Sequence, residues 1–259
     1  MLLRSLASAI TVLLCCPAPV WATEAPSDPA DHPGWSGYAG LGPAVFQKYT
    51  GGTRTRSLPM PIISASYNDI VYLEPFRAGA YFWSNADKTL GLSLAAEPRF
   101  GYSPHDGTKL TGMARRKRSV EAGPSIDWNF GVAALSVSAF SDLSGTTRGR
   151  SERLYLIKEY QHGPDWKGSA FVGLDRLSAR VANYYFGVRP EEVTAYRPHY
   201  EPGSATTVTL GCEGSYRLSA SYSAVFGLQL TRLNRPITQS PIVEIGHSGI
   251  FWAGFAWNL

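Results

Sequence analysis

Serine and histidine, the pair most often used for nucleophilic catalysis, are adjacent at His247-Ser248. That chemistry needs a serine within hydrogen-bond reach of a histidine and a third group that orients the ring. Neighbours along a strand point to opposite faces, so His247 and Ser248 cannot form the pair directly. The other histidines are scattered over the N-terminal segment, predicted loops and a turn: His32, His105, His162 and His199. We therefore expect no catalytic site and no enzymatic activity.

The sequence also lacks the residue patterns that are typical of metal-binding and cofactor-binding sites. No histidine or cysteine spacing is typical of a metal site, and no glycine-rich loop joins a strand to a helix to hold phosphate. The net charge of +4 is too small to indicate nucleic-acid binding. The sequence predicts no metal, no cofactor and no nucleic-acid partner.

Five charged residues alternate with apolar residues in segments that look like strands, namely Glu97, Arg99, Glu121, Asp127 and Glu213. Inside a barrel of intermediate size, such charges either line a solute path or neutralise one another and fill the lumen. Of these alternatives, the neutralising network is the favoured one.

Two loop segments could contact ligands. The cluster Arg115, Arg116, Lys117 and Arg118 could bind lipopolysaccharide phosphates through charge-assisted hydrogen bonds, and a solvated loop is an equal alternative. The segment 177–202 is rich in tyrosine and too long for a simple connection. We expect it to fold over a barrel mouth as a constriction or a contact surface.

Strict alternation of side-chain type indicates the elements that must position these residues. Segments 90–102, 119–128, 206–216 and 218–231 place apolar residues on one face and polar residues or glycine on the other almost without exception, and Val225 is the single exception in the last of them. A strand in a membrane barrel needs this pattern because one face meets lipid and the other the lumen. The same alternation predicts that Cys212 faces lipid.

The number and length of the alternating segments predict an all-β fold, a transmembrane antiparallel up-and-down β-barrel. We expect about twelve strands, at 36–47, 58–67, 69–74, 77–84, 88–101, 117–128, 132–143, 150–160, 166–176, 203–216, 218–231 and 247–258. Short turns alternate with longer loops, as in bacterial barrels. Tyr102, Trp128, Tyr216 and Trp257 lie near strand ends, where interfacial aromatic residues gather. Ten strands remain an alternative because the third, fourth and eighth segments are weak.

The N-terminus predicts export. A basic start at Arg4, an apolar run from Leu6 to Cys16 and small residues before Thr23 form the pattern of a secretory signal peptide. The run is shorter than the roughly 20 residues that span a bilayer. We expect residues 1–22 to be the signal peptide, 23–35 a short periplasmic leader and 36–259 the barrel, located in the outer membrane.

The chain resembles the MipA/OmpV family of outer-membrane barrels, which includes the MltA-interacting protein. The segments that carry the resemblance are Gly40–Pro43, Leu58–Ile63, Tyr184–Val188, Ala195-Tyr196 and Ser240–Val243. The resemblance implies a non-enzymatic envelope protein that scaffolds a lytic transglycosylase and a murein synthase from the periplasmic side. A small-solute channel or uptake barrel and a surface adhesin or antigen are the alternatives.

The C-terminal segment predicts how the chain reaches its membrane. Phe251, Ala253, Phe255, Trp257 and Leu259 form an apolar face. Trp252, Gly254, Trp257 and Leu259 match the spacing of the signal read by the outer-membrane assembly machinery, with leucine where such barrels usually end in phenylalanine. The expected general partners are this machinery, outer-membrane lipid and lipopolysaccharide.

Overall fold

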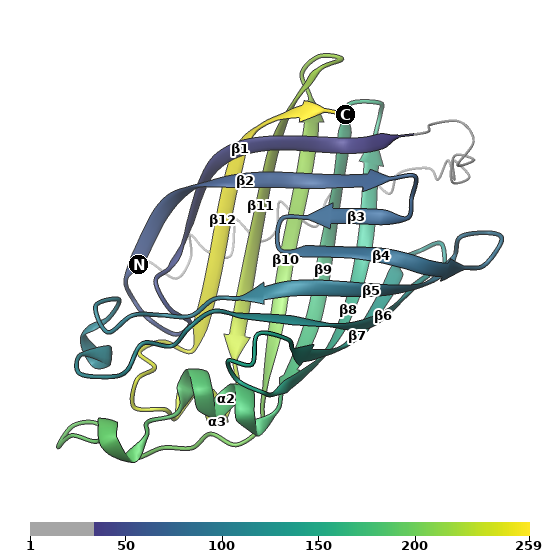
Figure 1. The fold of residues 1–259 in the computed structure, drawn as a ribbon. Coiled ribbons are helices and arrows are strands. Elements are labelled where there is room, and N and C mark those ends of the chain that lie inside the picture. Colours follow the sequence, from purple (N-terminus) through teal and green to yellow (C-terminus); the bar gives the residue numbers. More distant parts are fainter. Residues whose placement is uncertain (1–33) are drawn as a thin grey trace, which may run out of the picture.

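The computed structural model describes residues 34–259, which form one closed barrel of twelve antiparallel strands (Figure 1). The strands are β1 (Trp35–Gln47), β2 (Thr55–Tyr67), β3 (Val71–Glu74), β4 (Arg77–Ser84), β5 (Leu90–Arg99), β6 (Ser119–Asn129), β7 (Ala134–Asp142), β8 (Arg150–His162), β9 (Trp166–Leu177), β10 (Ala205–Arg217), β11 (Tyr222–Leu233) and β12 (His247–Asn258). The predicted fold and the count of twelve strands are confirmed. The predicted signal peptide, 1–22, lies outside the described residues.

Each strand pairs with its two neighbours, and β1 closes the barrel against β12, with Tyr38 opposite Asn258 and Phe46 opposite Ile250. Closure leaves no free edge at the chain ends, so most backbone groups of the wall find partners between strands. The weak third, fourth and eighth segments are all strands of the barrel, which excludes the ten-stranded alternative. No helix among residues 34–259 is long and apolar enough to cross a membrane.

The connections fall into two groups, one at each end of the barrel. The short-turn end carries the connections 68–70, 85–89, 130–133, 163–165 and 218–221. β1 begins and β12 ends at this same end of the barrel. The loop end carries 48–54, 75–76, 100–118, 143–149, 178–204 and 234–246. Short and long connections alternate as expected, except that the loop end also carries the two-residue turn 75–76.

The predicted faces are also confirmed. In β5, Leu94 is exposed on the outer face while Ser93 and Ala95 are buried on the inner one. Cys212 is exposed, as expected for a lipid-facing residue. Val225, the exception, faces the lumen but is buried there among apolar residues. The eleventh strand begins at Tyr222 and not at 218, because 218–221 form a turn.

Aromatic residues gather on the outer face at the short-turn end. They form four ring pairs with centroids 5.0–5.4 Å apart, namely Trp35–Tyr67, Trp128–Phe130, Trp166–Tyr216 and Tyr222–Trp257. Trp128, Tyr216 and Trp257 therefore lie where they were predicted. Tyr102 does not, because it is buried in the loops and donates a hydrogen bond to the carbonyl of Tyr185 at 3.0 Å.

Aromatic rings cover glycines of the neighbouring strand inside the lumen. Five such pairs occur: Tyr72 over Gly79, Tyr81 over Gly91, Tyr155 over Gly173, Phe171 over Gly211 and Trp252 over Gly227. A Cβ atom at any of these glycines would lie only 2.0–2.7 Å from a ring atom. The rings occupy space that a side chain would need, so these glycines let neighbouring strands interlock.

The four long loops at the loop end pack together, and we call them the loop cap: 48–54, 100–118, 178–204 and 234–246. The cap contains α2 (Ala179–Phe186) and α3 (Arg235–Thr238), which lie below the strands in Figure 1. Its buried centre includes Leu110, Val181 and Ile237. The predicted long loop thus carries a helix and takes part in a hydrophobic core of its own.

Candidate functional site

The most concentrated chemistry in the barrel is a set of ion pairs in the lumen around Glu121, which is only 1% exposed. Arg99 binds Glu121 in a bidentate manner, with Nε–Oε1 and Nη2–Oε2 distances of 2.7 and 3.0 Å. Arg153 reaches the same carboxylate through Nη2 at 3.1 Å. Ser151 adds a donated hydrogen bond of 2.7 Å. Bidentate and charge-assisted bonds of this kind hold the carboxylate in one orientation.

Three further residues extend the set across the lumen. Asp175 lies 3.3 Å from Arg99 and 3.7 Å from Arg153. Glu97 pairs with Arg153 and lies 3.8 Å from Arg77. We call the whole set the lumen network: Arg77, Glu97, Arg99, Glu121, Arg153 and Asp175. Three guanidinium groups face three carboxylates, so the formal charges balance.

Three of the five predicted lumen charges, Glu97, Arg99 and Glu121, therefore meet in this network. Asp127 stands apart, accepting hydrogen bonds from Ser136 at 2.6 Å and Tyr81 at 3.1 Å. Glu213 also stands apart, with the Ser169 hydroxyl at 3.4 Å. Both are neutralised less completely than Glu121. Arg77, Arg153 and Asp175 were missed in the sequence.

The basic loop cluster divides in the structure. Arg115, Lys117 and Arg118 are exposed, so their contact with lipopolysaccharide stays a prediction. Arg116 is wrong as a lipopolysaccharide ligand, because it is 1% exposed and its donors are already bound inside the cap. Its Nε donates to the Tyr184 carbonyl at 2.7 Å, and its Nη1 donates to the Ala114 carbonyl at 3.0 Å.

The main partner of Arg116 is Glu192, which belongs to the long loop and is also buried. The guanidinium grips both carboxylate oxygens, at 2.6 and 2.7 Å. Burial on its own would raise the pKa of Glu192, but the hydrogen bonds from Arg116 and from the backbone N–H groups of Arg189 and Ala114 outweigh it and lower the pKa to about 2. This pair joins the loop 100–118 to the loop 178–204.

Tyrosines complete the links between the loops. Tyr49 donates to Glu244 at 2.8 Å, which ties the first loop to the last. Tyr200 donates to the carbonyl of Pro236 at 2.7 Å. Burial raises the pKa of Tyr185 to about 12, so its hydroxyl stays protonated and close to Ser119, 3.0 Å away. The cap is therefore held by buried polar bonds as well as by apolar packing.

The residues considered for catalysis have structural contacts. Ser248 accepts a hydrogen bond from the backbone N–H of Gly51 at 3.0 Å, and His247 lies opposite Arg232 in the β11–β12 ladder. Among residues 34–259, no three histidine, cysteine or acidic side chains are grouped in a way that could hold a metal ion.

The closing strand β12 has two different faces. Phe255, Trp257 and Leu259 are exposed on the outer face, as predicted. Trp252 and Gly254 point into the barrel, where the Trp252 ring covers Gly227 and Gly254 lies against the backbone of Leu41. The four residues of the predicted assembly signal thus occupy both faces, and their recognition by the assembly machinery stays a prediction.

Comparisons with known proteins agree with this architecture. The model of a family described as MltA-interacting protein MipA matches residues 39–259. The outer membrane protein OmpV of Vibrio cholerae is 28% identical over 161 residues, and the outer membrane protein Omp26La of Vibrio anguillarum is 27% identical over 160. Each alignment covers 61% of this chain and 61% of the relative, so the chain spans about six-tenths of the length of these two proteins.

A third relative covers more of the chain. The MltA-interacting protein of Escherichia coli is 22% identical over 202 residues, which is 77% of this chain and 81% of the relative. Among solved structures, the NanC porin covers 86% of this chain with 11% identity and a TM-score of 0.43. The relatives' names and the barrel fold place the protein in the outer membrane. With the family match extending from the first strand to the last residue, the chain belongs to the MltA-interacting protein MipA family.

Proposed function

We propose that the protein is a non-enzymatic, non-conducting outer-membrane barrel that binds peptidoglycan-remodelling enzymes, a lytic transglycosylase and a murein synthase, at its short-turn end. In bacterial barrels the short turns face the periplasm, where those enzymes work. The name of the Escherichia coli relative, MltA-interacting protein, supports a protein-binding role for this family. It does not identify the contact surface.

The charge balance of the lumen network is the observation that supports a barrel that does not conduct ions. Three arginines and three acids neutralise one another across the lumen, and the cap packs over the loop end. In charge-selective pores, rings of charged side chains face the passing ions. Glu121, at 1% exposed, is held by two arginines and a serine instead.

Planar-bilayer recording tests this closure. We expect the purified barrel to show no discrete ionic openings, because the network and the cap occupy the path. Glu121→Ala should produce openings, since it removes the carboxylate that Arg99 and Arg153 share. Asp127→Asn, outside the network, is the matched variant and should stay silent. Steady openings of the wild-type barrel that change with Asp127→Asn would favour a solute channel.

The short-turn end also offers a surface for a partner. Val132 is 61% exposed in the turn 130–133, and Ile70 is exposed in the turn 68–70. These two apolar side chains are the ones that the proposed contact would bury.

A pull-down from mild-detergent membranes tests the partner. We expect murein enzymes to be recovered with the wild-type barrel and to be reduced severalfold by Val132→Lys. Leu143→Lys is the control, since Leu143 is equally apolar and exposed but lies at the loop end. Consistent absence of murein enzymes from the wild-type sample, or equal loss in both variants, would contradict the proposed contact.

A further inference from the structure

The barrel wall is incomplete on one side near the loop end. β3 has only four residues, and it pairs with β2 only through Ala65, Ser66 and Tyr67. The β4–β5 ladder reaches no further than Ala78 opposite Ala96. Residues 55–64 of β2 and 97–99 of β5 therefore have no strand between them in the described part of the chain. We call this region the wall opening, and Figure 1 shows β2 and β5 continuing toward the loops beyond the short β3–β4 hairpin.

The free edge of β2 is built from prolines. In the β1–β2 ladder the hydrogen-bonded pairs have even numbers, as shown by Lys48 donating to Arg54 and Asn68 donating to Gly34. Pro59 and Pro61 have odd numbers, so their nitrogens turn away from β1 and toward the wall opening. Proline has no N–H to leave unpaired there, which is why it is tolerated at a strand edge.

The opposite edge follows the same rule. In the β5–β6 ladder the odd-numbered pairs are hydrogen-bonded, as shown by Asn129 donating to Thr89 at 2.7 Å. Pro98 lies opposite Val120 in an even-numbered pair, so its nitrogen also faces the wall opening. Each unpaired N–H group costs roughly several kcal/mol in hydrocarbon. Because proline has no N–H group, these three prolines leave three fewer N–H groups unpaired. The prolines thus lower the cost of leaving these edges apart in a membrane, while the carbonyls of the same three residues still face the wall opening.

Aromatic rings fill the space between these edges. Phe100 stacks on Phe46 with centroids 6.5 Å apart, and Phe76 meets Phe100 edge to face at 6.0 Å. Phe76 also contacts Trp252 inside the lumen at 6.3 Å. Phe76 belongs to the two-residue turn 75–76 between β3 and β4. A short turn and a few rings, without backbone pairing, therefore separate the lumen from the membrane here.

Glu97 and Arg99 of the lumen network lie behind the β5 edge of the wall opening, whereas the lumen surface behind the β2 edge is apolar. We call this surface the apolar wall; its buried members are Ala44, Ile62, Val225, Trp252 and Ala256. They come from β1, β2, β11 and β12, whereas the lumen network comes from β4, β5, β6, β8 and β9. Leu58 lies on the lumen side of β2 at the opening and is 47% exposed, while Ile62, further from the loops, is fully buried. Leu58 is thus the accessible apolar residue at the opening, next to an apolar wall that is itself buried.

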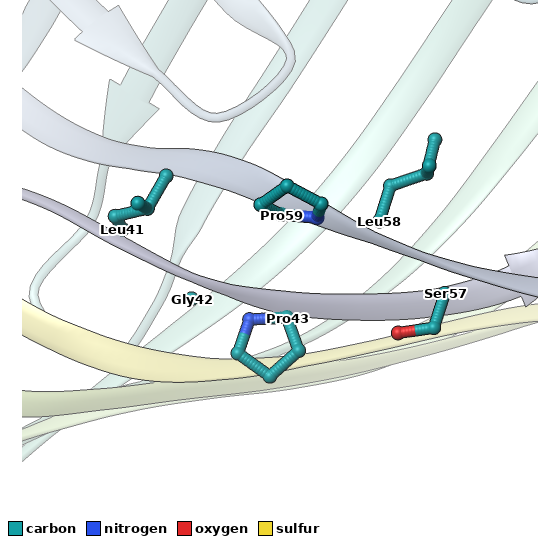
Figure 2. Close-up of a pocket in the computed structure, with 6 residues that line it drawn as sticks. All are labelled: Leu41, Gly42, Pro43, Ser57, Leu58 and Pro59. Atoms are coloured by element: carbon teal, nitrogen blue, oxygen red, sulfur yellow. The ribbon is translucent and has the colours of Figure 1, made fainter.

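A groove with a volume of about 350 Å³ lies along the β1–β2 pair, next to the opening (Figure 2). It is lined by residues of β1 and β2, namely Leu41, Gly42, Pro43, Ser57, Leu58 and Pro59. Apolar side chains and prolines dominate this lining. The polar groups that a hydrocarbon chain would meet at this lining are the Ser57 hydroxyl and the unpaired backbone carbonyls of Ser57 and Pro59.

A cation stands at the loop end of the opening. Arg56 packs over the Phe46 ring at 5.1 Å, and its Nη2 reaches the Lys48 carbonyl at 3.5 Å. Its Nε is buried and has no hydrogen-bond partner among residues 34–259. A buried N–H of a cation without an acceptor is costly, and an anionic oxygen nearby would relieve that cost.

We propose that the wall opening admits one acyl chain of an anionic lipid from the surrounding leaflet. The chain enters between β2 and β5, displaces the Phe76 ring and lies on the apolar wall near Trp252. The phosphate stays at the loop end and binds Arg56. The packed cap covers the loop end of the lumen, so the side of the barrel is the route by which a lipid reaches this surface.

Fluorescence quenching in bilayers tests this proposal. The barrel is prepared with Trp252 as its sole tryptophan, every other one being changed to phenylalanine, and placed in phosphatidylglycerol bilayers brominated at mid-chain. Bromine quenches only rings that it touches, so a lumen-facing tryptophan behind an intact wall keeps its fluorescence. We expect Trp252 to lose a large fraction of its fluorescence, and Phe76→Ala to increase the loss.

Two single-tryptophan controls set the scale. Leu210→Trp, at an exposed outer-face position in the middle of β10, gives full quenching, and Tyr155→Trp, in the lumen on β8, gives the protected value. Heat-modifiable migration in electrophoresis confirms that each variant is folded. Quenching of Trp252 no greater than that of the Tyr155→Trp protein, also with Phe76→Ala, would overturn the proposal.

The phosphate contact has a matched pair of variants. Arg56→Gln should reduce the quenching of Trp252 severalfold, because the anionic head group loses its ligand, whereas Arg54→Gln, at an exposed neighbouring position, should leave it unchanged. Equal quenching in both variants would exclude Arg56 as the phosphate ligand. Phosphatidylcholine quenching as strong as phosphatidylglycerol quenching would overturn the preference for a lipid of net negative charge.

Discussion

Glu192→Gln is expected to release the loop cap while leaving the strands intact. The substitution keeps the size of the side chain but removes the charge that both terminal nitrogens of Arg116 bind, at 2.6 and 2.7 Å. Both residues are buried, so the arginine is left charged without an anion. Removing one partner of a buried ion pair costs about 3–5 kcal/mol. That is enough to undock the loop 178–204 from the loop 100–118.

Limited proteolysis measures this release, since an undocked loop is cut within 178–204 and the barrel is not. Glu191→Gln is the matched control, because the neighbouring carboxylate is exposed and lies 4.0 Å from Arg189. Equal protection of the Glu192→Gln and Glu191→Gln proteins would show that the pair does not hold the cap.

The Arg116–Glu192 pair also predicts how the protection of the wild-type cap against proteolysis depends on pH. Its folded pKa of about 2 lies below the ordinary value of 4.5, so the stability it adds is complete above pH 4.5 and is lost as the pH falls toward 2. The cap should therefore stay protected at neutral and mildly acidic pH and become susceptible to an acid-active protease within that window.

Gly227→Val is expected to stop the barrel from closing normally. A Cβ atom at this position would lie 2.0 Å from the Trp252 ring, which packs in the lumen between β11 and β12. Overpacking typically costs 1–3 kcal/mol, and here the ring is confined by Phe76 on its other side. The β11–β12 pair would have to separate locally. We expect protein that migrates as unfolded without heating.

Electrophoretic migration before and after heating is the measurement. Gly246→Val is the control, because a Cβ atom there meets only Thr238, at an ordinary 3.5 Å. The double variant Gly227→Val with Trp252→Ala should recover part of the folded fraction, since it removes the ring that causes the clash. A folded fraction for Gly227→Val equal to that of Gly246→Val would contradict the interlocking of ring and glycine.

The strands could be read from the sequence because their pattern is local. Alternation over ten or more residues identifies a strand and its two faces at once, as it did for Leu94 and Ser93. The start of β11 was misplaced because Leu218 and Ala220 continue the alternation into a turn. Periodicity reports which side a residue would face, and not where backbone pairing stops.

The lumen network was only partly predictable for a different reason. Glu97 and Arg99 stand out because they interrupt an apolar strand, and their inward face follows from that. Arg153 lies in β8, where Lys158 and Glu159 interrupt the alternation of apolar and polar residues. Ser151 and Arg153 still share one face of this strand, and that shared face was the signal from which Arg153 could have been found. The pairing itself depends on barrel closure, which brings β5, β6, β8 and β9 together across the lumen.

Loop residues carried no such signal. Arg116 sits in a run of basic residues and looks like its neighbours, yet it is the one that Glu192 binds, 76 positions away. Tyr102 continues the alternation of β5 but is drawn into the cap by the carbonyl of Tyr185. Such long-range contacts have no sequence period, so their residues were assigned to the surface.

The four ring pairs at the short-turn end have a consequence for the height of the molecule in its membrane. Tryptophan and tyrosine prefer the boundary between hydrocarbon and water, so this belt fixes the barrel to the inner boundary of the bilayer. Changes in the thickness or sugar length of the outer leaflet would then shift the cap relative to the cell surface. The short turns would keep a constant distance from the peptidoglycan in the periplasm.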